Sequence, residues 1–100
     1  MIDKILLQCA SINQPRSLAS VALKVSEETG ELAQAVNKNI GNVVEEAADV
    51  IIAATDTAFL YLREQYGAET ATAAMAIMEL KIAEKLHKWN NLYSLQTEKE

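Results

Sequence analysis

Two short stretches of sequence decide the fold: KVSEETGEL, residues 24–32, and VVEEAADVI, residues 43–51. Each places carboxylates inside a segment that is otherwise largely apolar. The apolar side chains around them recur at spacings of four and three, which at about 100° per residue align along one side of a helix. They are Leu18, Ala22, Val25, Thr29, Leu32 and Val36 in the first segment and Val43, Ala47, Val50, Ala54, Thr57 and Tyr61 in the second. We therefore predict two amphipathic helices with acidic residues beside each apolar stripe.

Local signals set the ends of these two helices. The first helix follows the break NQPRS, residues 13–17, and ends near Asn37. The turn KNIGN, residues 38–42, comes next, and Asn42 can cap the second helix with Glu45 as its capping-box partner. Gly67 marks the end of that helix, because glycine favours the left-handed conformation found there. A turn this tight makes the two helices antiparallel neighbours.

Two further helices flank this pair. Residues 1–12 form a short candidate helix, and residues 70–92 form a long one, followed by a polar tail, residues 93–100, that we expect to fray. Glycine and proline total four residues against sixteen alanines, a balance that favours an all-helical protein. The 100 residues fit a single domain. We predict an all-α fold of four helices.

Composition argues against several kinds of partner. The net charge of −5 disfavours a nucleic-acid backbone, because phosphate contacts need a surplus of Lys and Arg. The apolar run 43–62 contains four carboxylates, which a membrane span would not carry. Cys9 is the only cysteine, so we expect a buried thiol and neither a disulfide nor a thiolate zinc site. No signal-peptide pattern opens the chain, and we expect a cytoplasmic protein.

The predicted helix at residues 43–66 is apolar almost all round. Between Val50 and Leu62 its only charged residue is Asp56. A helix of this kind is buried on more than one side, and four short helices from one chain cannot easily enclose it. A second copy of the chain would do so. We therefore expect a homodimer or homotetramer whose interface uses the two central helices, which would complete a four-helix bundle.

Carboxylates of the two central helices are expected to meet at one edge of their shared seam. Glu28 and Glu31 lie to one side of the first stripe. Glu46 and Asp49 lie to the same side of the second. Four adjacent carboxylates repel one another, so they take up protons or bind cations. Oxygen ligands at this density suit Mg²⁺ or Mn²⁺. The alternative interpretation of the same spacing is a solvated acidic face.

At these residues the sequence resembles a known family, the all-α nucleotide pyrophosphohydrolases that include MazG, phosphoribosyl-ATP pyrophosphohydrolase and the dCTP pyrophosphatases. The shared pattern is EExxE, a gap, then ExxD. Here it reads Glu27-Glu28-Thr-Gly-Glu31, fourteen residues, then Glu46-Ala-Ala-Asp49. The PRSL of residues 15–18 resembles the dCTP-pyrophosphatase branch. The likeness covers residues 14–62 well and the fourth helix loosely.

The resemblance implies an activity and a metal ion. The family cleaves the α–β phosphoanhydride of a nucleoside triphosphate, yielding monophosphate and pyrophosphate, and its members are Mg²⁺-dependent dimers or tetramers. By this likeness Glu28, Glu31, Glu46 and Asp49 are the catalytic carboxylates and the metal ligands. A deoxynucleotide such as dCTP, or a damaged nucleotide, is the expected substrate. The chain has no GxxxxGKS loop to cradle phosphates, so the ion must neutralise most of their charge.

Basic and aromatic residues are candidates for binding the substrate. Lys81, Lys85 and Lys88 recur on one face of the fourth helix, where the family places basic residues near the triphosphate. Their alternative role is a Glu/Lys surface face. Lys24, close to the first acidic cluster, either contacts phosphate or neutralises its neighbours. Trp89 stacks on a base, or else closes the core or the subunit interface.

Two other functions fit parts of the sequence. Glu84 and His87 form an ExxH motif of the kind found in di-iron bundles, but such a site needs the motif on each of two helices, and His87 is the only histidine. A non-catalytic helical module that regulates a partner protein would keep the apolar stripes without needing the four carboxylates. Mg²⁺-dependent activity separates the enzyme from such a module.

Overall fold

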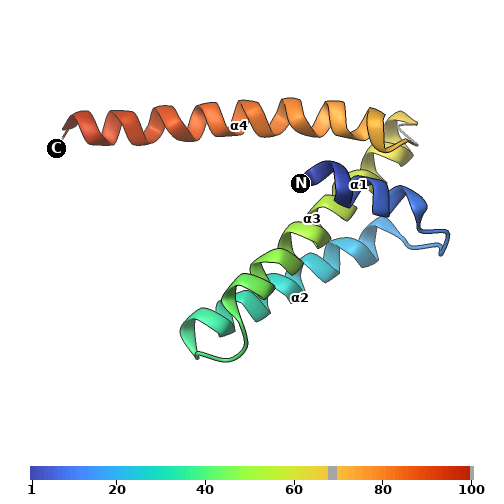
Figure 1. The fold of residues 1–100 in the computed structure, drawn as a ribbon, viewed down its shortest axis with the longest axis horizontal. Coiled ribbons are helices and arrows are strands. Elements are labelled where there is room, and N and C mark those ends of the chain that lie inside the picture. Colours follow the sequence, from blue (N-terminus) through green and yellow to red (C-terminus); the bar gives the residue numbers. More distant parts are fainter. Residues whose placement is uncertain (68–69, 100) are drawn as a thin grey trace.

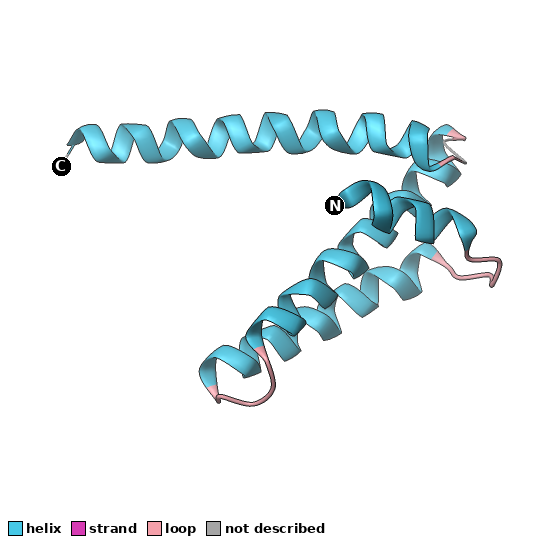
Figure 2. Ribbon diagram, viewed as in Figure 1, coloured by secondary structure: helices cyan, strands magenta, loops and turns pink. Residues whose placement is uncertain are grey.

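The computed structural model describes the backbone of residues 1–67 and 70–99 and the side chains of residues 1–67 and 70–93. Within these residues the chain forms four helices and no strand (Figure 1; Figure 2), which confirms the predicted all-α fold. The helices are α1 (Ile2–Ser11), α2 (Leu18–Asn37), α3 (Val43–Tyr66) and α4 (Ala71–Lys99). The backbone of α4 continues past the predicted end at Leu92. The expected fraying of the tail, 93–100, stays a prediction: its backbone is described as helical to Lys99, and of its side chains only that of Tyr93 is described.

Helices α2 and α3 form an antiparallel hairpin, which runs diagonally away from the other two helices in Figure 1. The turn between them contains Asn39 at φ 54° and Gly41 at φ 84°. This left-handed conformation is one that glycine adopts freely and asparagine tolerates. The side chain of Asn42 then caps α3 by accepting hydrogen bonds from two backbone N–H groups, those of Val44 and Glu45. The hairpin is therefore fixed by local chemistry at its turn.

The packed face of the hairpin is rotated by about one residue from the predicted stripes. The buried and half-buried positions along it are Leu18, Val21, Val25, Glu28, Leu32 and Ala35 on α2 and Glu46, Ala47, Val50, Ala53, Thr57 and Leu60 on α3. The predicted positions that are exposed instead are Ala22, Thr29 and Val36 on α2 and Val43, Ala54 and Tyr61 on α3. The spacing of three and four is as predicted, but each face includes a carboxylate. Glu28 and Glu46 therefore lie in the seam between the helices rather than beside it.

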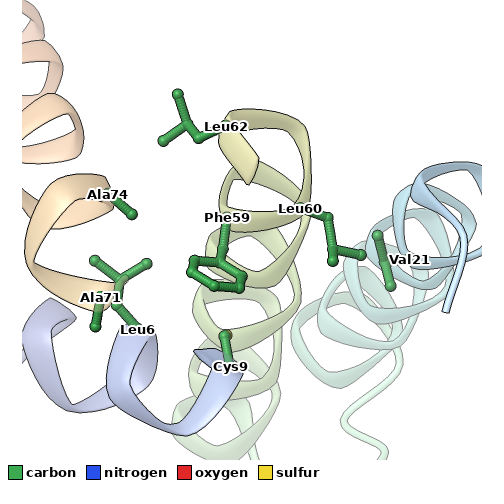
Figure 3. Packing of buried hydrophobic residues seen from close by; sticks show 8 residues of the cluster. All are labelled: Leu6, Cys9, Val21, Phe59, Leu60, Leu62, Ala71 and Ala74. Atoms are coloured by element: carbon green, nitrogen blue, oxygen red, sulfur yellow. The ribbon is translucent and has the colours of Figure 1, made fainter. Parts of the chain in front are cut away.

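The hydrophobic core lies where α1 meets the end of α3 and the start of α4 (Figure 3). Phe59 points toward Leu6 and Cys9 of α1, while Leu60 points toward Val21 of α2. Leu6, Phe59 and Leu60 are fully buried, and each such side chain contributes roughly 1.5–3 kcal/mol to stability. Cys9 is a buried thiol, as predicted, and burial raises its pKa to about 11. The core thus anchors α1 and α4 to one end of the hairpin.

Helix α4 leaves this core and extends away from the hairpin (Figure 1). Up to Tyr93, where the description of its side chains ends, its buried and half-buried residues all lie near its start, and every residue from Glu79 to Tyr93 is exposed. The exposed side chains include six large apolar or aromatic ones: Leu80, Ile82, Leu86, Trp89, Leu92 and Tyr93. In the described part of the chain α4 contacts α1 and α3 but not α2. None of the described helices carries a stretch both long and apolar enough to cross a bilayer.

Candidate metal centre

Three carboxylates of the hairpin converge on one point. Oxygen atoms of Glu28 from α2 and of Glu46 and Asp49 from α3 lie within 4.8 Å of one another. The spacing of three residues puts Glu46 and Asp49 on one side of α3, and the antiparallel hairpin brings Glu28 to meet them. Glu28 is 7% exposed, Glu46 is half-buried and Asp49 is exposed. The cluster therefore runs from the packed seam to the surface.

Glu31, the fourth predicted ligand, lies beside this cluster and outside its group of close oxygen atoms. Its side chain is exposed. The pKa of Glu46 is raised, first by the loss of solvent around it and then by its interaction with the Glu31 carboxylate; Asp49 and Glu28 add further repulsion. The structure thus brings together three of the four predicted carboxylates and sets the fourth at their edge.

Two oxygen atoms in the cluster are unsatisfied. Oε2 of Glu28 and Oε2 of Glu46 are both buried and have no hydrogen-bond partner among the described residues. Burying a carboxylate oxygen without a compensating contact is costly. A divalent cation supplies such a contact, and hard oxygen donors suit Mg²⁺ or Mn²⁺. The residues therefore fit a metal ion held by Glu28, Glu46 and Asp49.

Lys24 lies against the carboxylates of Glu27 and Glu28. Its Nζ is 3.2 Å from Oε1 of Glu28 and 3.3 Å from Oε2 of Glu27. These contacts, with Glu28 the stronger influence, raise the pKa of Lys24. Of the two roles expected for this lysine, the structure shows the contact that neutralises its neighbours. The Lys24 side chain is more than half exposed, so it can also turn toward a ligand.

A cavity of about 500 Å³ adjoins the carboxylates. Its apolar lining is Ile5 and Cys9 from α1, Ile12 directly after that helix, and Ile52 and Ala53 from α3. Its polar lining is Lys4, Gln8, Lys24, Glu28, Asp49 and Asp56. This volume lies in the range of small-molecule sites, which combine apolar walls with a few polar groups. Two of the three clustered carboxylates thus open onto a space large enough for an organic ligand.

An ion pair that sequence reasoning missed lies beside this cavity. Nη2 of Arg16 is 2.6 Å from Oδ1 of Asp56, and Nε is 3.0 Å from Oδ2, a bidentate arrangement. The same Nη2 donates to the carbonyl of Cys9 at 3.3 Å. This pairing raises the pKa of Arg16. The signal in the sequence was Asp56 itself, because one carboxylate in an apolar helix needs a cation. Its partner is 40 residues away, where no local spacing indicates it.

The predicted substrate-binding residues of α4 lie apart from the carboxylates. Lys81, Lys85 and Trp89 line a groove of about 270 Å³ along α4 itself. Lys81 pairs with Glu84 at 3.3 Å, and Lys88 is exposed. Because α4 does not contact α2 in the described chain, one copy does not bring these four side chains to the site on the hairpin.

Comparison with known proteins identifies one family. The family model described as the MazG nucleotide pyrophosphohydrolase domain matches residues 16–88. The match includes both acidic clusters and begins after α1. Neither a curated protein nor a solved structure was found to match the chain.

Proposed function

Because the chain belongs to the MazG nucleotide pyrophosphohydrolase family, we propose that it hydrolyses a nucleoside triphosphate to the monophosphate and pyrophosphate with Mg²⁺ as cofactor. Membership makes it a hydrolase of phosphoanhydride bonds. The observation that carries the proposal is the convergence of Glu28, Glu46 and Asp49 within 4.8 Å. The resemblance of its PRSL segment to the dCTP pyrophosphatases supports a deoxynucleotide, with dCTP the first to test.

Three of the four carboxylates have separate tasks in this proposal. Mg²⁺, when bound, neutralises phosphate charge and helps to activate the attacking water. Glu28 is buried in the seam between the two helices, so its oxygens keep one direction. Asp49 is exposed and lies where a triphosphate enters, and Glu31 is placed to accept a hydrogen bond from water at the edge of the cluster. Lys24 turns from Glu28 to a phosphate oxygen as substrate arrives.

We also propose that the protein works as a homodimer or homotetramer. Its support is the apolar surface that a single chain leaves uncovered: Ile51 and Ile52 on α3 are 41% and 51% exposed, and Trp89 on α4 is 57% exposed. Covering such side chains drives association. In an assembly, α4 of one copy is the element that carries Lys81 and Lys85 toward the carboxylates of another. The nucleotide substrate supports a cytoplasmic location.

A panel of nucleoside and deoxynucleoside triphosphates tests the reaction. We expect release of pyrophosphate in the presence of Mg²⁺ and none when the ion is chelated. Orthophosphate with a diphosphate product would refute cleavage at the α–β bond. The absence of turnover across the whole panel would favour a non-catalytic helical module, which needs no metal.

A further inference from the structure

One wall of the cavity beside the carboxylates comes from α1, which lies outside the residues matched by the family model. Ile5 and Gln8 of α1 and Ile12, the residue after it, line the cavity. Their spacing of three and four places them along one side of this helix and its end. Ile52 and Ala53 of α3 also line it. The α1 wall of the cavity is therefore mostly apolar, with the amide group of Gln8 and the ammonium group of Lys4 as its polar members.

Arg16 ties the two walls of the cavity together. Its guanidinium binds the carboxylate of Asp56, on α3, through two nitrogens at 2.6 and 3.0 Å. It also binds the carbonyl of Cys9, near the end of α1, at 3.3 Å. The side chains of the pair are only 15% and 18% exposed, so solvent screens this contact much less than a surface ion pair. Asp56 lines the cavity and Arg16 does not.

We propose that the Arg16–Asp56 pair is a positioning device that fixes α1 as the wall of a nucleoside pocket beside the carboxylates. The inference rests on the proposed function. The cavity has two parts that match the two parts of a nucleotide. Its apolar wall with the amide of Gln8 suits the base and sugar, and Glu28, Asp49 and Lys24 lie where the phosphates and their cation belong. The pair acts through the placement of α1.

This arrangement separates nucleotide binding from turnover. The clustered carboxylates belong to the hairpin. Helix α1 contacts α3, but its core contacts are with Phe59, ten residues beyond Asp49. Loosening α1 therefore removes contacts to the nucleoside and leaves the carboxylates in place. The nucleoside does not change during hydrolysis, so these contacts are equally strong in the ground state and the transition state. Loss of such uniform binding raises KM and leaves kcat unchanged.

Two conservative variants test the pair. Arg16→Lys keeps the charge but cannot form the bidentate contact, and Asp56→Asn keeps the shape but removes the charge. We expect each to raise KM for the nucleotide about tenfold, equivalent to about 1.4 kcal/mol, with kcat within about twofold. Arg63→Lys and Glu64→Gln make the same exchanges on α3 outside the cavity, and we expect both to keep the parent KM.

Inorganic tripolyphosphate distinguishes positioning from a general loss of structure, because it has no nucleoside. Measured calorimetrically with Mg²⁺, its affinity should be the same for the parent and Arg16→Lys. The affinity of the nucleoside monophosphate product should fall about tenfold. If Arg16→Lys fails to fold, Gln8→Leu tests the same wall at an exposed position and should raise KM.

Three outcomes would overturn the inference. They are an unchanged KM in these variants, a fall in kcat alone, and an equal loss of affinity for both ligands. Each of them leaves the hydrolase activity of the parent standing. If instead the parent hydrolyses no triphosphate, the proposed function fails, and the two calorimetric affinities still decide whether the pair positions a nucleoside wall.

Discussion

The α2–α3 hairpin and the helix α4 place their charged and apolar side chains in opposite ways. The hairpin buries Glu28 in its seam and leaves two carboxylate oxygens without hydrogen-bond partners in the described part of the chain. Helix α4 keeps its charges exposed, as in the pair Lys81–Glu84, and also leaves large apolar side chains such as Leu86 and Trp89 at the surface. Within the described residues, the hairpin thus has buried polar atoms that lack hydrogen bonds, whereas α4 has large apolar side chains exposed to solvent.

Each of these two features is stabilised by a different kind of binding partner. A buried carboxylate without a partner is compensated by a cation or a proton. An exposed row of large apolar side chains is compensated by another protein surface. The hairpin is therefore the place of the proposed chemistry, and α4 is the place of the proposed contact with a second copy of the chain. Three perturbations separate these two roles.

The largest effect should come from removing a charge in the hairpin. Asp49→Asn takes an anionic ligand from the proposed metal site, so turnover should fall by about a hundredfold or more, or about 2.7 kcal/mol in activation free energy. Without Mg²⁺ the variant should melt at the same temperature as the parent or higher, because one repulsion has been removed. Mg²⁺ should raise the melting temperature of the parent by mass action, and that of the variant much less.

The control is Glu45→Gln, the same loss of charge at an exposed residue next to the cluster. It should keep both the turnover and the Mg²⁺ response. Thermal melts of the three proteins with and without Mg²⁺ provide the comparison. Equal responses of the parent and Asp49→Asn would show that Asp49 is not a ligand.

A smaller effect is expected from a charge placed on the apolar groove of α4. Leu86→Glu should weaken self-association by about ten- to a hundredfold, because burying one leucine contributes roughly 1.5–3 kcal/mol. Asn91→Glu adds the same charge on the opposite side of α4 and should leave the assembly intact. Light scattering across a dilution series measures both. A parent protein that is a stable 11.0 kDa monomer at micromolar concentration would contradict the proposed assembly.

The smallest effect concerns the caps that begin the two longest helices. Asn42 accepts two backbone hydrogen bonds at the start of α3, and Thr70 accepts one, from Ala73, at the start of α4. Asn42→Ala should lower the free energy of unfolding by about 1 kcal/mol, and Thr70→Ala by about half as much. Urea denaturation gives both values. A larger loss from Thr70→Ala would mean that α4 contributes more to stability than its few buried residues indicate.

The local features of the hairpin were predictable because they depend on neighbouring residues. Asn42 caps α3 as predicted, although the carboxylate of Glu45 forms no return bond in the described chain. Gly67 ends α3 at φ 65°, and its N–H donates to the carbonyl of Arg63. The carboxylate spacing likewise placed Glu28, Glu46 and Asp49 together, because helical periodicity and an antiparallel turn determine which side chains meet.

The remaining features were not predictable from local patterns. A stripe of apolar residues assumes that charges avoid the packed face, yet Glu28 is among the most buried residues of α2. A site that requires a buried carboxylate overrides that rule. The Arg16–Asp56 pair joins residues far apart in the sequence, and the cavity depends on where α1 comes to lie. Both need tertiary structure, which periodicity does not supply.

The distance along the chain between Arg16 and Asp56 also affects the order in which the molecule assembles. The hairpin helices are joined by the short turn 38–42, so their contacts close a small loop and form early. Docking of α1 depends on longer-range contacts, such as the Arg16–Asp56 pair across 40 residues, and therefore follows. We expect amide hydrogens of α1 to exchange with solvent at a lower opening free energy than those of α3. The nucleoside wall would then fold after the hairpin and open before it.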